Sequence, residues 1–173
     1  MPAFITLFAL LLALSGVACS AAPATTSAAS DAAAAPPVAA AAAVHDGRPV
    51  EISADDTMKF SVTEIAAKPG EKLSVTLVNL GTTPKFSMGH NWLLLASKVD
   101  VQPFLVAAAQ AMTTDYVPMA TQKDHILAAT KLLGPKERDT VTFTAPSAPG
   151  RYEFVCSFPG HYQVGMRGVL IVG

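Results

Sequence analysis

The chain has 173 residues, 51% of them hydrophobic, and a formal net charge of -1 at pH 7. All 12 Lys and Arg, and all but one of the 13 Asp and Glu, lie between residues 46 and 167, so this part of the chain is neutral. Neutralising phosphates requires a basic surface, so the composition argues against a nucleic-acid partner and against strong electrostatic steering of any partner.

The first 19 residues have the pattern of an export signal. A nearly unbroken apolar run from Phe4 to Leu14 is followed by small residues up to Cys19, and it is too short to span a bilayer. The segment Gly-Val-Ala-Cys that ends at Cys19 resembles a bacterial lipobox, which implies that Cys19 carries a lipid. Cleavage after Ala18 or Ala22 without lipidation is the alternative. We therefore expect a periplasmic protein, either free or anchored to the membrane through lipidated Cys19.

Residues 20–46 are rich in Ala, Pro, Ser and Thr and contain no aromatic residue. Such a segment has too little large apolar surface to fold, and its prolines interrupt any helix. We expect it to be a disordered tether between the signal peptide (1–19) and one folded domain (47–173).

The folded part begins with short segments of β character. Alternation of apolar and polar residues, with turn residues between the segments, indicates about seven strands. The expected strands are Val50–Ser53, Thr57–Val62, Leu73–Asn79, Asn91–Leu95, Thr140–Thr144, Arg151–Cys156 and Gly168–Val172. Strands of this number and length predict an all-β sandwich or barrel.

The interval 97–138 does not alternate in this way. We expect a helix over Phe104–Met112, started by Pro103, and a further helical turn or two over Asp124–Leu133, stopped by Gly134 and Pro135. The interval therefore predicts a partly helical flap outside the sandwich.

Metal-binding side chains are concentrated near the C-terminus. Cys156, His161 and Met166 lie in one loop between two predicted strands, and His90 lies just before another strand. Two imidazoles and a thiolate in a plane, with a weak axial thioether, form the arrangement of blue-copper electron-transfer sites. In addition, an unpaired Cys156 in an oxidising compartment is explained if a metal holds the thiolate.

These residues resemble the azurin and auracyanin branch of the cupredoxins. The similarity covers about residues 48–173 and rests on the segments Met88–Trp92 and Cys156–His161, with support from 130–134 and 139–143. It implies an eight-stranded Greek-key sandwich with one copper ion per chain. It also implies that Asn91 and the backbone amides after Cys156, including that of Phe158, form hydrogen bonds around the ligands. The carbonyl of Gly89 would be a distant fifth contact.

The sequence departs from azurin in three ways. Four residues rather than three separate His161 from Met166, as in auracyanins and plastocyanins. We expect this extra residue to change the axial distance of Met166, and it argues against the Gly89 contact. There is no further Cys for azurin's structural disulfide. The 78–84 connection contains no His, so we expect no titrating histidine there.

The leading functional hypothesis is a carrier that shuttles single electrons between redox partners. We expect it to exchange electrons with a c-type cytochrome, an oxidase or a reductase through an apolar surface around His161, the ligand expected at the exposed edge of the site. An enzyme with a further copper cluster needs more ligands, and only His45 and His125 remain. Copper storage or delivery is the alternative function, although the remaining Met residues are scattered, and a zinc-binding module is a further alternative.

Overall fold

The computed structural model describes residues 46–173. The expected signal peptide (1–19) and, apart from Asp46, the expected tether (20–46) lie outside the described residues. Among the helices of residues 46–173, none has the length and apolar character needed to cross a bilayer.

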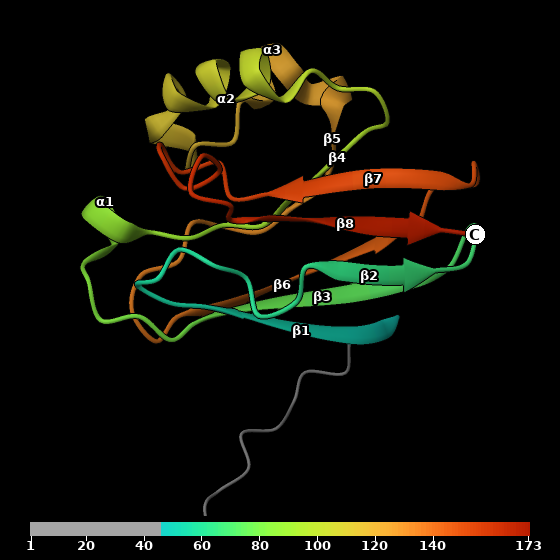
Figure 1. Ribbon diagram of the computed structural model, residues 1–173, viewed down its shortest axis with the longest axis horizontal. Helices are drawn as coiled ribbons and strands as arrows, with labels where there is room; N and C mark the ends of the chain where they lie inside the picture. Colours follow the sequence, from blue (N-terminus) through green and yellow to red (C-terminus); the bar gives the residue numbers. More distant parts are fainter. Residues whose placement is uncertain (1–45) are drawn as a thin grey trace, which may run out of the picture. The chain divides into compact units, whose positions relative to one another are not determined.

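Eight strands form two sheets that pack face to face (Figure 1). In the first sheet the order is β1 (Arg48–Ala54), β3 (Lys72–Asn79) and β6 (Arg138–Thr144). In the second it is β2 (Glu64–Ala67), β8 (Arg167–Val172), β7 (Gly150–Val155), β4 (Leu93–Leu95) and β5 (Ile126–Ala129). The pairs β1/β3 and β2/β8 are parallel, and the other pairs are antiparallel. The expected all-β sandwich is therefore confirmed, with the eight strands that the resemblance implied.

The main core lies between the two sheets. Leu73, Val75 and Leu77 alternate along β3 and are fully buried against it. The Trp92 ring, just before β4 of the second sheet, lies with its centroid 5.9 Å from that of Phe143 in β6 of the opposite sheet. Each large apolar side chain buried in this way contributes about 1.5–3 kcal/mol, so this layer holds the two sheets together.

A second, smaller core covers the outer face of the second sheet. Leu93 and Leu95 of β4 pack there against Phe104, while Leu94 between them faces the main core. Phe104 belongs to helix α2 (Val101–Ala109), which lies over this sheet (Figure 1). Burial of β4 on both faces explains its continuous apolar sequence.

The helical insert extends from α2 to His125. It continues with the 3-10 helix η1 (Met112–Thr114), helix α3 (Met119–Gln122) and the 3-10 helix η2 (Lys123–His125). The expected flap is thus present, but the helical turns expected over Asp124–Leu133 are wrong beyond His125, where η2 ends. Residues 126–129 form strand β5, which pairs with β4 at the edge of the sheet. Hydrogen bonding to that edge outweighs the helical propensity of the alanines there.

The strand expected over Thr57–Val62 is also wrong. Asp55 forms a turn in which its carbonyl accepts a hydrogen bond from the Met58 amide at 3.0 Å and its side chain accepts one from the Thr57 amide at 2.9 Å. Only Phe60 makes an isolated bridge in this segment, and β2 begins later, at Glu64. Aspartate favours this kind of side-chain-stabilised turn over a strand.

The connections that carry the candidate ligands meet at one pole of the sandwich. Strand β7 ends at this pole and β8 begins there, and the short helix α1 (Lys85–Met88) lies beside them at the left of Figure 1. The fold therefore brings the segment before β4 next to the loop between β7 and β8.

Candidate metal centre

The loop between β7 and β8 is closed by its own backbone. The Cys156 amide donates to the Met166 carbonyl at 3.1 Å, and the Met166 amide donates to the His161 carbonyl at 3.0 Å. Gly160 and Gly165 turn the chain with φ of 88° and 96°, a region that favours glycine. The three expected loop ligands are consequently held on one compact turn.

His90 is fixed by a backbone bridge to the segment that follows β5. Its amide donates to the Leu133 carbonyl at 3.1 Å, and its carbonyl accepts from the Leu133 amide at 2.7 Å. Gly89 precedes it at a very close approach, because a Cβ there would lie 2.7 Å from the Lys85 carbonyl oxygen and 2.8 Å from Leu132 Cγ. Only glycine allows the chain to pass at this point and present His90.

Three donor atoms converge at the pole. His90 Nδ1 and His161 Nδ1 are 3.3 Å apart, and Cys156 Sγ lies 3.4 Å from His161 Nδ1. All three donors lie within 4.8 Å of one another. Ligand nitrogen and sulfur atoms bind an ion at about 2.0–2.3 Å, so donors at these separations can share one ion. Met166 is fully buried in the same loop.

Burial sets the protonation of these donors. Burial, together with a smaller effect of the neighbouring His90, lowers the pKa of His161 to about 4. Burial also lowers the pKa of His90, against the opposing effects of the Asp55 carbonyl and the carboxylates of Asp56 and Asp55. Both imidazoles are therefore neutral at pH 7 and offer lone pairs to a metal.

Burial shifts the pKa of the Cys156 thiol in the opposite direction. Burial outweighs the opposing hydrogen bonds from the backbone amides of Asn91 and Phe158 and raises the pKa of Cys156 to about 12. The thiol thus keeps its proton at neutral pH until an ion replaces it. The same amides are the groups that can stabilise a bound thiolate.

The Asn91 side chain connects the two ligand-bearing segments. Its Oδ1 accepts from the Ser157 amide at 2.9 Å, and its Nδ2 donates to Ser157 Oγ at 2.9 Å. The Phe158 ring lies with its centroid 4.6 Å from that of His161. The structure therefore places both residues, which the resemblance implied as neighbours of the ligands, around the donor cluster.

Sequence reasoning did not single out Ser157, Asp115 or Tyr116. Ser157 Oγ donates to the Tyr116 carbonyl at 2.7 Å, and Asn91 Nδ2 donates to the Asp115 carbonyl at 2.9 Å. Both acceptors are backbone atoms of the helical insert, and side-chain identity gives no signal for such a contact. His125 is exposed in η2, away from the cluster, and His45 lies outside the described residues.

Residues 49–173 match the model of the copper-binding proteins of the plastocyanin/azurin family. The chain is a cupredoxin of this family. It is similar to azurin from Pseudomonas chlororaphis, with 34% identity over 126 residues that cover 71% of this chain and 96% of the azurin. It is also similar to outer membrane protein H.8 of Neisseria gonorrhoeae, with 37% identity over 112 residues that cover 64% of this chain and 60% of that protein.

Solved structures agree with this assignment. Dithionite-reduced auracyanin from the photosynthetic bacterium Roseiflexus castenholzii matches with a TM-score of 0.65 and 33% identity, covering 75% of this chain and 99% of the auracyanin. The expected cofactor, copper, is confirmed by the family and by the His90, Cys156 and His161 donor group. A thiolate with two imidazoles is a donor set that suits copper.

The protonation states of the cupredoxin's donors predict the proton balance of metal binding. At pH 7, we expect about one proton to be released per ion bound, because only the Cys156 thiol must lose one. Zn(II), which has no redox chemistry, is the suitable probe, and calorimetry in buffers of different ionisation enthalpy measures the release. Cys156→Ser should release almost none. Release of two or more protons would mean that the imidazoles are protonated and that the assigned pKa shifts are wrong.

Proposed function

We propose that this cupredoxin transfers single electrons through one type 1 copper site whose ligands are His90, Cys156, His161 and Met166. The observation that supports this most directly is the convergence of the two Nδ1 atoms and the thiol sulfur within 4.8 Å in a buried site. Relatives named azurin and auracyanin support the same function.

Bound copper supplies the one-electron couple, Cu(I) and Cu(II), and no bond of a substrate is made or broken. Cys156 contributes a thiolate, which favours Cu(I), and the imidazoles of His90 and His161 suit both oxidation states. Backbone hydrogen bonds close the loop and fix His90, so the donors keep their places when an electron arrives. Because the ligands then move little between the two oxidation states of copper, electron exchange is fast.

Met166 is proposed as the weak axial ligand. Its backbone is hydrogen-bonded to both Cys156 and His161, and its side chain is fully buried in the same loop. The Gly89 carbonyl is proposed as a weaker contact. An axial thioether tunes the reduction potential without fixing the geometry of the plane.

We propose that the protein is not an enzyme. Copper storage or delivery is the second candidate function. A storage or delivery site has to release its ion, whereas the donors here are buried and interlocked by hydrogen bonds. Within the described residues, Met112 and Met119 are exposed in the insert and do not form an open thioether site. No specific observation favours the second function.

The spectrum of the copper-loaded protein tests the proposal. We expect an intense visible absorption from thiolate-to-copper charge transfer, which a mild reductant bleaches reversibly. Cys156→Ser should abolish the absorption because it removes the thiolate. Met166→Leu should keep the colour and raise the reduction potential, because loss of a donor destabilises the more highly charged Cu(II). A colourless complex with one equivalent of Cu(II) would contradict the proposal.

Redox partners are proposed to dock on the apolar surface at the copper pole. The expectation that His161 forms the exposed edge needs correction, since its side chain is only 2% exposed, beside the Phe158 ring. Exposed apolar side chains on the segments of this pole include Phe86 of α1, at 83%, and Val164 of the ligand loop, at 45%. An electron therefore crosses a thin apolar layer between His161 and the partner, which we propose to be a c-type cytochrome, an oxidase or a reductase.

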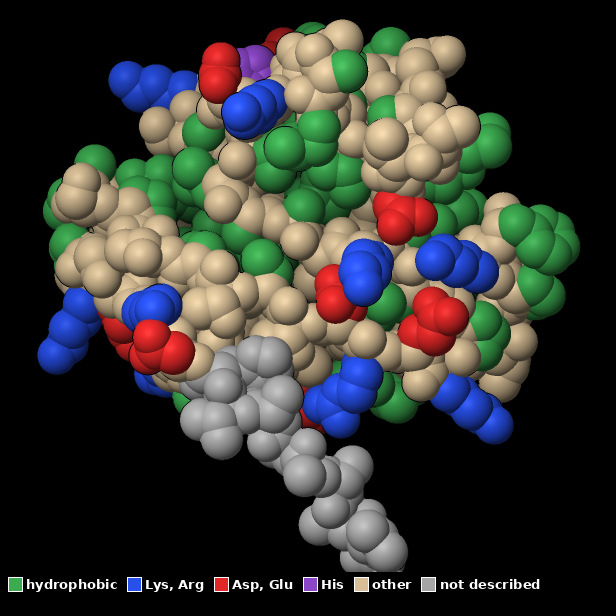
Figure 2. Space-filling view, turned by 180° about the vertical axis from the view of Figure 1, so that it is seen from behind, with side chains coloured by type: hydrophobic (Ala, Val, Ile, Leu, Met, Phe, Trp, Pro, Cys, Tyr) green, Lys and Arg blue, Asp and Glu red, His purple; other side chains and the backbone are tan. Residues whose placement is uncertain are grey.

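The charge distribution agrees with apolar docking. Figure 2 shows acidic and basic side chains interspersed over one face, and hydrophobic side chains at the right-hand edge, which is the pole drawn at the left of Figure 1. Docking through a small apolar patch gives weak and rapidly exchanging complexes.

The docking proposal predicts the effect of a charge at Val164. Val164→Lys should slow electron self-exchange about tenfold at low salt, because two like charges then meet when two copies approach. Met119→Lys is the control, since Met119 is comparably exposed but lies in α3, over the second sheet. NMR line broadening in mixtures of oxidised and reduced protein measures the rate. Equal rates in the two variants would place the docking surface elsewhere.

The proposed location is the periplasm, with attachment to the membrane through a lipid on Cys19. The pattern before Cys19 and the relative named an outer membrane protein support this proposal. Cells that express the full chain should incorporate labelled palmitate into the wild type and not into Cys19→Ser. Absence of label in the wild type would favour a free periplasmic carrier.

A further inference from the structure

A turn of the helical insert has an unusual backbone where it meets the ligand-bearing segments. Asp115 and Tyr116 have φ of 58° and 59°, in the left-handed region, although neither is glycine. Other L-residues enter this region rarely, and here two do so in succession. Hydrogen bonds within the insert hold the turn, from the Tyr116 amide to the Ala111 carbonyl and from the Thr114 hydroxyl to the Val117 carbonyl, both at 2.9 Å.

This conformation directs two carbonyls toward the metal centre. The Asp115 carbonyl accepts from Asn91 Nδ2 at 2.9 Å, and the Tyr116 carbonyl accepts from Ser157 Oγ at 2.7 Å. Asn91 follows the ligand His90 in the chain, and Ser157 follows the ligand Cys156. Each carbonyl therefore fixes the residue next to a ligand.

The Tyr116 side chain makes a second contact with the ligand loop. Its ring meets that of Phe158 edge-on, with centroids 5.0 Å apart, and Phe158 in turn lies 4.6 Å from His161. Tyr116 is only 8% exposed, so its ring is held in the core. The turn thus contacts the surroundings of Cys156 through hydrogen bonds and those of His161 through a chain of neighbouring aromatic rings.

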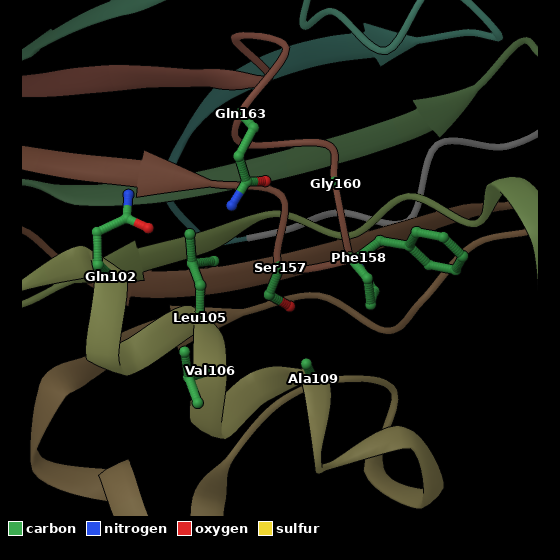
Figure 3. A pocket seen from close by; sticks show the side chains of 9 residues that line it. Gln102, Leu105, Val106, Ala109, Ser157, Phe158, Gly160 and Gln163 are labelled. Atoms are coloured by element: carbon green, nitrogen blue, oxygen red, sulfur yellow. The ribbon is translucent and has the colours of Figure 1, made fainter.

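Helix α2 of the same insert belongs to the smaller core against which Tyr162 of the loop packs, but it forms no hydrogen bond with Ser157. A pocket of about 200 Å³ separates it from the start of the loop. Figure 3 shows Leu105, Val106 and Ala109 of α2 on one side of this pocket and Ser157 and Phe158 on the other. Within the described residues, the hydrogen bonds of Ser157 go to Asn91 and to the Tyr116 carbonyl of the Asp115–Tyr116 turn, and none goes to α2.

We propose that the Asp115–Tyr116 turn is a positioning element of the copper centre. It holds Asn91 and Phe158 so that their backbone amides stay directed at the Cys156 sulfur. Hydrogen bonds to this sulfur tune the potential, and they stabilise most the electron-rich thiolate of the reduced site. Loosening the turn therefore lowers the reduction potential, a consequence that rests on the proposed electron-transfer function.

The test uses the copper-loaded full chain and two matched pairs of variants. Asp115→Val places a β-branched residue where φ is 58°, whereas Asp115→Gly accepts that conformation. Tyr116→Ala removes the ring, whereas Tyr116→Phe keeps it. We expect the Val and Ala variants to lower the equilibrium constant for copper reduction about tenfold, which is about 59 mV for one electron, and the Gly and Phe variants to stay within about twofold. The charge-transfer absorption should shift in the same two variants.

A purely structural turn would give a different result. In that case Asp115→Val and Tyr116→Ala would unfold at a lower urea concentration but would keep the wild-type reduction potential and absorption when folded. This result would overturn the proposal. If Asp115→Val fails to fold, the reduction potentials of Tyr116→Ala and Tyr116→Phe decide between the two outcomes.

A second measurement does not depend on copper. In the metal-free full chain, iodoacetamide should alkylate Cys156 about tenfold faster in Asp115→Val than in Asp115→Gly, since a loosened loop opens more often. Mass spectrometry of the peptide that contains Cys156 follows the reaction, and the Tyr116 pair is compared in the same way. Equal rates within both pairs would overturn the proposal. A wild-type chain that binds no copper would instead overturn the proposed function, and the alkylation comparison would still decide the role of the turn.

Discussion

The proposed chemistry of this cupredoxin depends on the close approach of three metal-binding side chains in a buried site. His90, Cys156 and His161 are at most 2% exposed, and their donor atoms lie within 4.8 Å of one another. Burial keeps the imidazoles neutral and the thiol protonated, so the site is ready for an ion that displaces one proton. An isolated thiolate in such surroundings is costly, and a bound cation with two amide donors offsets that cost.

The two sheets make this approach possible because they fix segments that lie far apart in the sequence. The bridge between His90 and Leu133 anchors one ligand, and the closure from Cys156 to Met166 anchors the others. Asn91 then ties the two segments together through Ser157. Each contact uses backbone or short polar side chains, which have little freedom to lose and hold the donors rigidly.

The helical insert contributes at two levels. Phe104 covers the outer face of β4 and stabilises the sheet by burial, while the Asp115–Tyr116 turn contacts the surroundings of the ligands. A non-glycine residue in the left-handed region costs about 1–2 kcal/mol, so the turn persists because its hydrogen bonds and the burial of Tyr116 offset the strain. The insert is thus more than a cover for the sheet, since it joins the second core to the metal centre.

The sequence by itself determined the β-rich class, the family resemblance and the choice of His90, Cys156 and His161 as a metal-binding group. Period-2 alternation and the spacing of Cys156, His161 and Met166 are local patterns. Such patterns can be recognised in the sequence without knowledge of the fold. Only the tertiary structure decided that residues 126–129 form an edge strand, that Asp55 makes a turn where a strand was expected, and that His161 is buried. It also decided the contacts of Asp115 and Tyr116, which act through backbone carbonyls. The physical reason is that sheet pairing, burial and carbonyl direction depend on neighbours distant in the chain, and no single segment encodes them.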